Sequence, residues 1–233
     1  MPADRPMARG SCCWALVVGL AAVLLLWARA PFAPRNFWGE DGTRFFAHAM
    51  ADGWIRPLGR SLAGYFHFLP RLLGAVGTMV PLEWAPAAVF VGCLASVGWF
   101  AATIWLAGDR LLPDPFVRSA VAVSPVLLPI VGFESIANVT NLHFVMLCAT
   151  SAVLIGRQES TGRQVNGVLL VAMAGLTSPV TAGLAPLVAL RMWWDRRERG
   201  SLSPAPVVAG WAFGLVVQLV MMATMVDEGR EMT

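Results

Sequence analysis

The sequence predicts an all-α fold: a polytopic membrane bundle of about seven transmembrane helices, with interfacial helices in a long first outer loop. Only 13% of the 233 residues are charged, against about 25% in soluble domains. Charges also cluster, which leaves uncharged stretches at residues 11–28, 84–107, 164–190 and 200–226. A bilayer core needs roughly 20 apolar residues of helix. This excludes a soluble enzyme, a disordered chain and a secreted disulfide scaffold.

The first apolar segment has two interpretations. Arg5 and Arg9 precede the apolar run 12–27, which is followed by the small-x-small triplet 28–30, as in a signal peptide. The run is longer than the roughly 7–15 residues usual for a signal peptide, and Pro31 would occupy the first mature position. We therefore favour a retained first transmembrane helix. Either interpretation places the following residues on the outer face.

The long outer loop, residues 31–83, is too polar to span a membrane but rich in aromatic residues. Such a mixture suits helices that lie in the interface with their apolar face toward lipid. We predict two of them, at residues 41–51 and 61–80. The apolar side of the first consists of Phe45, Phe46, Ala49 and Met50.

The chain after this loop is predicted to complete the seven spans. They are expected at residues 84–107, 119–133, 139–156, 165–177, 182–190 and 205–226. The stretch 165–190 could also form one long helix. A break at Ser178-Pro179 is favoured because proline removes a backbone hydrogen bond.

The arginines predict the orientation of the bundle. All 17 basic residues are arginine, and ten lie in four short segments that share one side if the N-terminus is cytoplasmic. These segments are residues 1–10, 108–118, 157–163 and 191–199. The positive-inside rule then predicts a multi-pass protein of the cell membrane, surrounded by the lipid bilayer. Because no basic stripe with interleaved aromatics occurs, no nucleic-acid partner is expected.

An acidic pair heads the outer loop, in the sequence Trp38-Gly39-Glu40-Asp41-Gly42. Adjacent carboxylates could bind a divalent cation or act as a general base. Asp41 also suits the N-cap of a helix that begins at the next residue. Residue type alone favours the cap, and Asp41 could serve in both ways.

A second acid, Glu134, is expected in the next outer turn, near Asn138, Asn141 and His143. A carboxylate at the bilayer centre costs about 2.5–3.5 kcal/mol on insertion scales, so an acid between two spans is a candidate functional residue. A solvated loop acid is an equally good interpretation. His143 is more simply a polar helix contact than a metal ligand.

A third polar feature combines Tyr65, His67 and Arg71. Residues 67 and 71 are spaced i, i+4 and would share one face of the second interfacial helix. A cationic face at headgroup level would suit a lipid-linked phosphate. Ordinary snorkelling toward lipid phosphates explains the same pattern equally well.

This order of elements resembles the GT-C-type membrane glycosyltransferases that use polyprenyl-phosphate sugars, such as the protein O-mannosyltransferases and the lipid A aminoarabinose transferases. The resemblance is carried by residues 40–50, by Asp52-Gly53-Trp54, by Tyr65-Phe66-His67 and by the break at 175–179. The break lacks the family's lysine and has Ser178 beside Thr177. Family members contain more spans, so residues 1–233 are expected to form a single transmembrane domain, either truncated or a core module.

The resemblance implies inverting transfer of a sugar from a polyprenyl-phosphate donor to an acceptor on the outer face. Asp41, helped by Glu40, would be the general base, and Glu134 would share a divalent metal, Mg or Mn, with Asp41. Arg71 and His67 would neutralise the phosphate. The remaining substrate-binding candidates are Trp38, Trp54, Tyr65 and Asn141. The rival is a non-catalytic integral membrane protein: a lipid-binding scaffold, a subunit or a transporter fragment.

Overall fold

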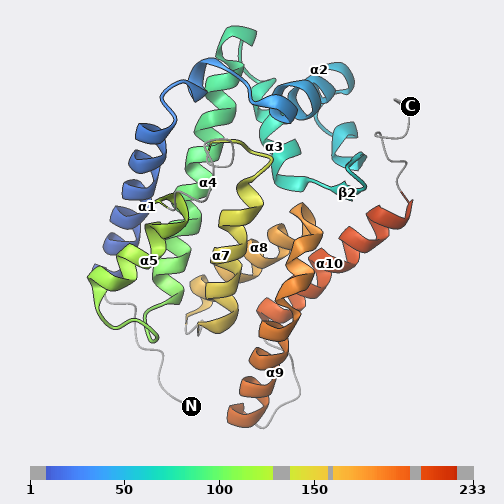
Figure 1. Ribbon diagram of the computed structural model, residues 1–233. Helices are drawn as coiled ribbons and strands as arrows, with labels where there is room; N and C mark the ends of the chain where they lie inside the picture. Colours follow the sequence, from blue (N-terminus) through green and yellow to red (C-terminus); the bar gives the residue numbers. More distant parts are fainter. Residues whose placement is uncertain (1–8, 128–136, 157–159, 200–205, 225–233) are drawn as a thin grey trace.

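The computed structural model describes residues 9–127, 137–156, 160–199 and 206–224, and its fold is nearly all helical (Figure 1). The α-helices are α1 (Arg9–Arg29), α2 (Ala47–Asp52), α3 (Phe68–Gly77), α4 (Ala85–Ala107), α5 (Pro115–Leu127), α7 (Leu142–Ile155), α8 (Thr161–Thr177), α9 (Ala185–Arg199) and α10 (Pro206–Thr224). Short 3-10 or π turns are η1 (Ala33–Arg35), η2 (Asp41–Phe46), η3 (Arg56–Gly59), η4 (Leu82–Trp84) and η5 (Pro179–Leu184). Strands β1 (Ser61–Leu62) and β2 (Tyr65–Phe66) form one small hairpin. The predicted all-α class is confirmed.

The predicted number of spans is wrong for the described part of the chain. Three described helices are long and apolar enough to cross a membrane: Ser11–Arg29, Leu82–Ala107 and Pro206–Thr224. By contrast α7, with 14 residues, is only about 21 Å long at 1.5 Å per residue, shorter than a hydrocarbon core of about 30 Å. The count of seven failed because an uncharged stretch does not show where turns end a helix.

Close helix crossings hold the bundle together. A Cβ on Gly19 of α1 would lie 2.8 Å from the carbonyl oxygen of Gly98 in α4, so the two backbones touch. Gly175 of α8 and Gly214 of α10 make a second such crossing, with a Cβ on Gly175 only 2.8 Å from the Gly214 Cα. Small residues at crossings are typical of membrane helix pairs.

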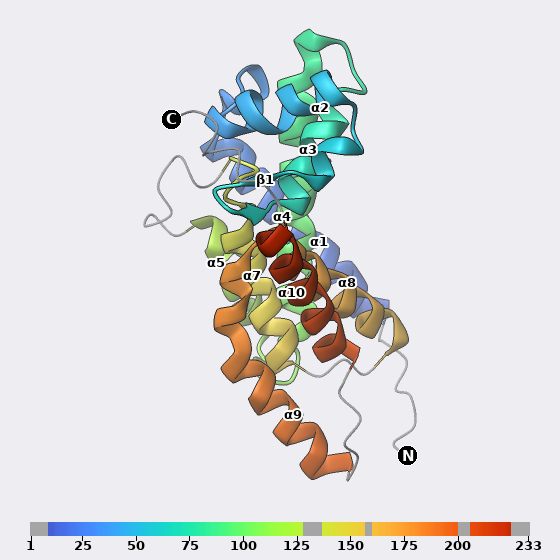
Figure 2. The same cartoon turned by 90° about the vertical axis from the view of Figure 1, so that its right-hand side faces the viewer.

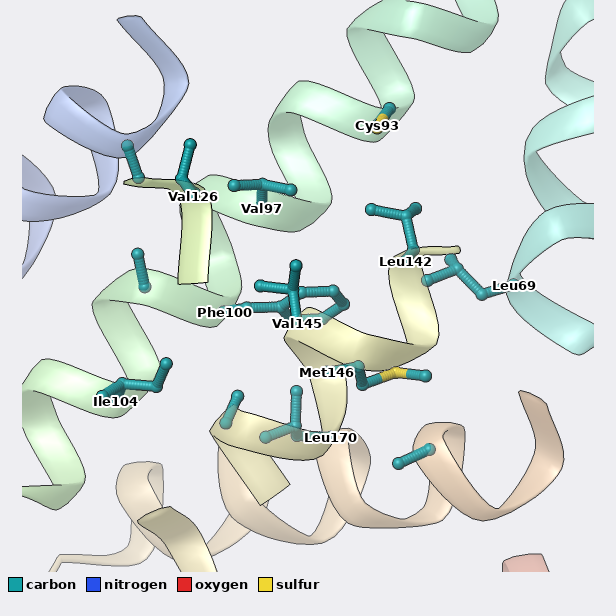
Figure 3. Packing of buried hydrophobic residues seen from close by; sticks show 14 of the residues in the cluster. Leu69, Cys93, Val97, Phe100, Ile104, Val126, Leu142, Val145, Met146 and Leu170 are labelled. Carbon is teal, nitrogen blue, oxygen red and sulfur yellow. The ribbon is translucent and has the colours of Figure 1, made fainter. Parts of the chain in front are cut away.

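One apolar core connects the helices. Phe100 of α4, Val145 and Met146 of α7, and Leu170 of α8 meet in its middle (Figure 3). Residues of α1, α5 and α10 join the same cluster. The shorter α7 therefore packs one side into this core, whereas Phe144 on its other side is 49% exposed.

The predicted break at Ser178-Pro179 is confirmed. Helix α8 ends at Thr177, Ser178 has extended backbone angles (φ −152°, ψ 133°), and Pro179 begins η5. Helix α9 then runs back along the bundle toward the start of α8. Arg191 of α9 shows this direction, because it donates a hydrogen bond to the carbonyl of Gly156, which lies between α7 and α8. The alternative of one long helix is wrong.

The interfacial helices are only partly as predicted. The helix predicted over residues 41–51 is confirmed as η2 followed by α2. The sequence predicts that its apolar side faces lipid, but Phe45, Phe46 and Ala49 are buried against the protein and only Met50, at 58%, is exposed. At 3.6 residues per turn, Met50 lies about 140° around the helix from Phe45, which explains this difference. In the second, residues 61–66 form the β1–β2 hairpin, and the helix is only α3. Ala63 and Gly64 have positive φ values of 54° and 79°, which suit a two-residue hairpin turn.

The bundle has two ends, at which different elements gather. Helices α2 and α3 and the hairpin gather at one, here called the α3 end (Figures 1 and 2). The last turns of α9 lie at the opposite end, the α9 end, together with the α4–α5 connection and the start of α8 (Figures 1 and 2).

Candidate functional site

Asp41 binds a turn that is almost a hundred residues away in the sequence. Its side chain is buried, with 3% of the residue exposed. Its carboxylate accepts hydrogen bonds from the Val139 N–H (3.0 Å), the Thr140 N–H (3.3 Å) and the Thr140 hydroxyl (2.9 Å). The helical turn around Asp41 already begins at Gly39. The interpretation of Asp41 as the N-cap of its own helix is therefore wrong.

The turn that Asp41 binds leads directly into α7. The Asn138 side-chain oxygen accepts from the Thr140 N–H (2.7 Å), and the Asn138 carbonyl accepts from the Asn141 N–H (3.2 Å). Two successive N–H groups thus point at one carboxylate near the positive end of the α7 dipole. Asn141, a predicted substrate-binding residue, immediately precedes α7. The Asx pattern Asn138-x-Thr140 is a sequence signal that could have indicated this turn, although the prediction did not use it.

Burial dominates the acidity of Asp41. It raises the pKa of the Asp41 carboxyl from 3.8 to about 6, and the neighbouring charge of Glu40 adds to this increase. The hydrogen bonds from Val139 and Thr140 act in the opposite direction, because they favour the ionised form. Asp41 therefore titrates close to neutral pH. The side chain of Glu40, unlike that of Asp41, is exposed.

His67 and Arg71 are buried rather than directed to lipid headgroups. Only 2% of His67 and 1% of Arg71 is exposed, so snorkelling is wrong for Arg71. His67 lies just before α3, and its carbonyl accepts from the Arg71 N–H (3.1 Å). Arg71 lies over the ring of Phe45, with its Cζ 5.6 Å from the ring centre, and Nη1 is 3.5 Å from His48 Nδ1.

His67 is neutral at physiological pH. Burial lowers the pKa of His67 to about 4, and the positive charge of Arg71 and the ring of His143 lower it further. Its ring stacks on Tyr65 with centroids 3.9 Å apart, so Tyr65 packs against the histidine. The sequence predicts that His67 and Arg71 form a cationic face together. Because His67 is neutral, Arg71 is the cation of this pair.

The structure brings three polar groups of residues together at the α3 end. They are Asp41, the segment 138–143, and the set Tyr65, His67 and Arg71. Phe45 follows Asp41 in η2 and contacts both His67, at 5.6 Å between centroids, and Arg71. His143 Nδ1 lies 2.8 Å from the carbonyl of Thr140, whose hydroxyl and N–H reach Asp41. Two segments far apart in sequence therefore enclose one polar cluster.

The metal prediction depends on Glu134, which lies outside the described residues. Within the described ranges, no group of three His, Cys, Asp or Glu side chains could hold a metal ion. The carboxylate of Asp41 is also engaged by three donors. A metal shared by Asp41 and Glu134 therefore stays a prediction.

A cavity of about 280 Å³ lies between the η1 region and the start of the 137–141 segment. Its lining is mainly apolar and includes Phe32, Asn36, Phe37, Trp38 and Ala137. Phe37 also stacks on Phe46 (4.7 Å between centroids), which connects the cavity wall to η2. Trp38 is thus placed for ligand contact, whereas Trp54 is 54% exposed.

Comparisons with protein-family models, curated proteins and solved structures yield no match to this chain. The resemblance to GT-C glycosyltransferases consequently remains a prediction from the sequence.

Proposed function

We propose that the chain is a membrane glycosyltransferase that moves a sugar from a polyprenyl-phosphate donor to an acceptor hydroxyl at the α3 end. One observation carries the proposal: a buried carboxylate, Asp41, titrates near neutral pH in the same cluster as the buried guanidinium of Arg71. Sugar transfer from a lipid phosphate needs a base for the acceptor and a cation for the leaving group.

Asp41 has the chemistry of the base. An ionised carboxylate has about four lone-pair positions, of which the described donors occupy three. Oδ2 accepts a single bond, from Val139, and keeps a lone pair for an acceptor hydroxyl. The acceptor oxygen bonds to the anomeric carbon as its proton moves to Asp41. The bond from the anomeric carbon to the phosphate oxygen breaks, which inverts the configuration.

Arg71 is the cation for the departing phosphate. Phe45 and His48 hold its guanidinium in place, and arginine suits phosphate oxygens because its planar fork donates two parallel hydrogen bonds. The apolar cavity beside Trp38 would accept the sugar or the first prenyl units. Its volume of about 280 Å³ is near the lower bound of roughly 300 Å³ for small-molecule sites.

The test compares Asp41→Asn with Thr140→Val in the purified full chain, assayed with a panel of polyprenyl-phosphate sugars. Asp41→Asn should lower transfer by about 10² to 10⁴-fold, the usual contribution of a general base. Thr140→Val removes a hydrogen bond to the carboxylate but keeps the base, so it should retain most activity. Transfer by the parent chain should rise with pH around 6. Undiminished transfer by Asp41→Asn would refute the base assignment.

The rival function, a non-catalytic integral membrane protein, is favoured by the same three hydrogen bonds to Asp41. They would also suit a carboxylate whose sole task is to hold η2 against the turn before α7. On that interpretation the parent chain transfers no sugar from any donor of the panel, while Asp41→Asn still loses stability.

A further inference from the structure

A second cavity, of about 170 Å³, lies at the α9 end, on the opposite side of the bundle from Asp41. It opens between the α4–α5 connection, the end of α7 and the middle of α9. The polar and aromatic residues of its wall are Arg110, Arg191, Trp194 and Asp195. Nothing in the proposed transfer reaction uses this cavity.

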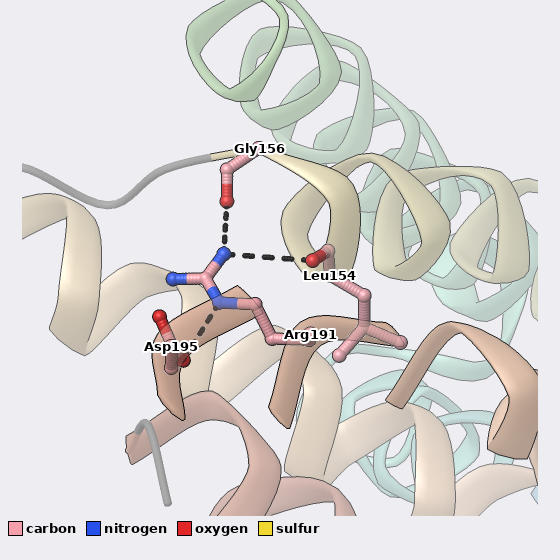
Figure 4. A network of polar contacts seen from close by, with 4 residues as sticks. All are labelled: Leu154, Gly156, Arg191 and Asp195. Carbon is pink, nitrogen blue, oxygen red and sulfur yellow. Dashed lines mark hydrogen bonds and ion pairs between the residues drawn. The ribbon is translucent and has the colours of Figure 1, made fainter. Parts of the chain in front are cut away.

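Arg191 is the fixed cation of this cavity. It is 5% exposed. Its Nε donates to Asp195 (3.0 Å), and its Nη1 donates to the carbonyls of Gly156 and Leu154, the latter at 3.5 Å (Figure 4). These contacts stabilise the carbonyl end of α7. They also lock the guanidinium in one orientation.

The other terminal nitrogen of Arg191, Nη2, has no acceptor among the described residues. Figure 4 shows it pointing away from both carbonyls. It is therefore a preoriented donor in the wall of the cavity. The described residues of the wall include two arginines and one carboxylate.

The surroundings of the cavity are those of a membrane interface. Trp193 and Trp194 are 52% and 39% exposed, and Arg197 stacks on Trp193 with its Cζ 5.3 Å from the ring centre. Exposed tryptophan beside arginine is typical of the headgroup level of a bilayer. Basic pockets between membrane helices bind anionic lipid headgroups.

We infer that this cavity binds the phosphate of an anionic phospholipid headgroup, with Nη2 of Arg191 and the side chain of Arg110 as its donors. Its volume equals that of about five or six waters at roughly 30 Å³ each, which is room for a phosphate group. The neighbouring exposed Leu111 and Met192 would contact the acyl chains. A soluble phosphate would not need this apolar rim.

The test uses the purified full chain in a neutral detergent, titrated with short-chain phosphatidylglycerol, phosphatidylcholine or inorganic phosphate at one ionic strength. The readouts are the Tm and native mass spectra. Phosphatidylglycerol should raise the Tm and remain bound, and the other two should not. Arg110→Gln should weaken the apparent affinity for phosphatidylglycerol about fivefold, the effect of one interfacial arginine.

Matched variants separate the cavity from general electrostatics. Arg197→Gln removes the same charge at the same end but outside the cavity, and should change the affinity less than twofold. Arg191→Lys keeps the charge but loses the fork, so it should bind more weakly. If Arg191→Lys does not fold, the affinity of Arg110→Gln for phosphatidylglycerol tests the inference by itself. Equal shifts by phosphatidylcholine or inorganic phosphate would overturn the inference, as would equal effects of Arg110→Gln and Arg197→Gln.

Discussion

Replacing Asp41 with asparagine should loosen the contact between η2 and the turn before α7. The carboxylate accepts three hydrogen bonds from Val139 and Thr140, at 2.9 to 3.3 Å, in a site that excludes water. Asparagine has nearly the same shape, so the substitution changes the hydrogen bonding and leaves the packing intact.

The size of the effect follows from these contacts. The amide oxygen of asparagine can keep the two bonds from Thr140. Its NH₂ group then faces the N–H of Val139, and two donors oppose each other. Losing one bond to a charged group and leaving a buried N–H unsatisfied costs about 3 kcal/mol in total. Thr140→Val, which removes only the hydroxyl bond, should cost about 1.5 kcal/mol.

The assay is reversible unfolding in mixed dodecylmaltoside–SDS micelles, followed by the fluorescence of the ten tryptophans. Thr43→Val is the matched control, because the exposed Thr43 hydroxyl bonds only to the Gly39 carbonyl of its own helix (2.8 Å); it should cost less than about 0.5 kcal/mol. If Asp41→Asn unfolds at the same SDS fraction as the parent chain, or Thr43→Val costs as much, the assigned role of these hydrogen bonds is wrong.

Three further outcomes are expected. Because burial raises the pKa of Asp41 from 3.8 to about 6, the folded chain binds this proton more tightly than the unfolded chain, and the proton-linked part of the stability is complete below pH 3.8 and is lost as pH rises through 6. Lowering the pH from 7 to 5 should therefore add about 1 kcal/mol to the free energy of unfolding, measured in the same micelles. Gly19→Ala, whose new Cβ would lie 2.8 Å from the Gly98 carbonyl oxygen, should cost about 1–3 kcal/mol by forcing α1 from α4. Asn166→Leu, which removes the 2.7 Å bond from Trp99, should cost about 0.6–1.7 kcal/mol.

Each of these outcomes has its own control. The pH effect should disappear in Asp41→Asn, and its persistence there would assign it to another group. Gly162→Ala is the control for the glycine crossing, since a Cβ at Gly162 meets nothing within 4 Å; equal losses would contradict the crossing. For Asn166, a parent-like stability would mean that Trp99 finds another acceptor.

The helical class and the position of the helix break were already determined by local chemistry. Long uncharged, apolar stretches favour helices long enough to cross a membrane, and Pro179 cannot donate a backbone hydrogen bond, so α8 ends beside it. The acidic pair and the 138–143 segment were likewise recognisable as polar residues beside apolar runs. These signals depend on neighbouring residues alone.

Other features required the tertiary structure. The number of long apolar helices depends on where turns end each helix, and the hairpin at Ala63-Gly64 depends on backbone angles. Above all, the partners of Asp41 lie 98 and 99 residues away, and the pKa of its carboxyl depends on the segments that exclude water from it. Burial and long-range hydrogen bonds arise only when distant segments pack together. For that reason the sequence alone could suggest Asp41 as a candidate but could not identify its partners or its acidity.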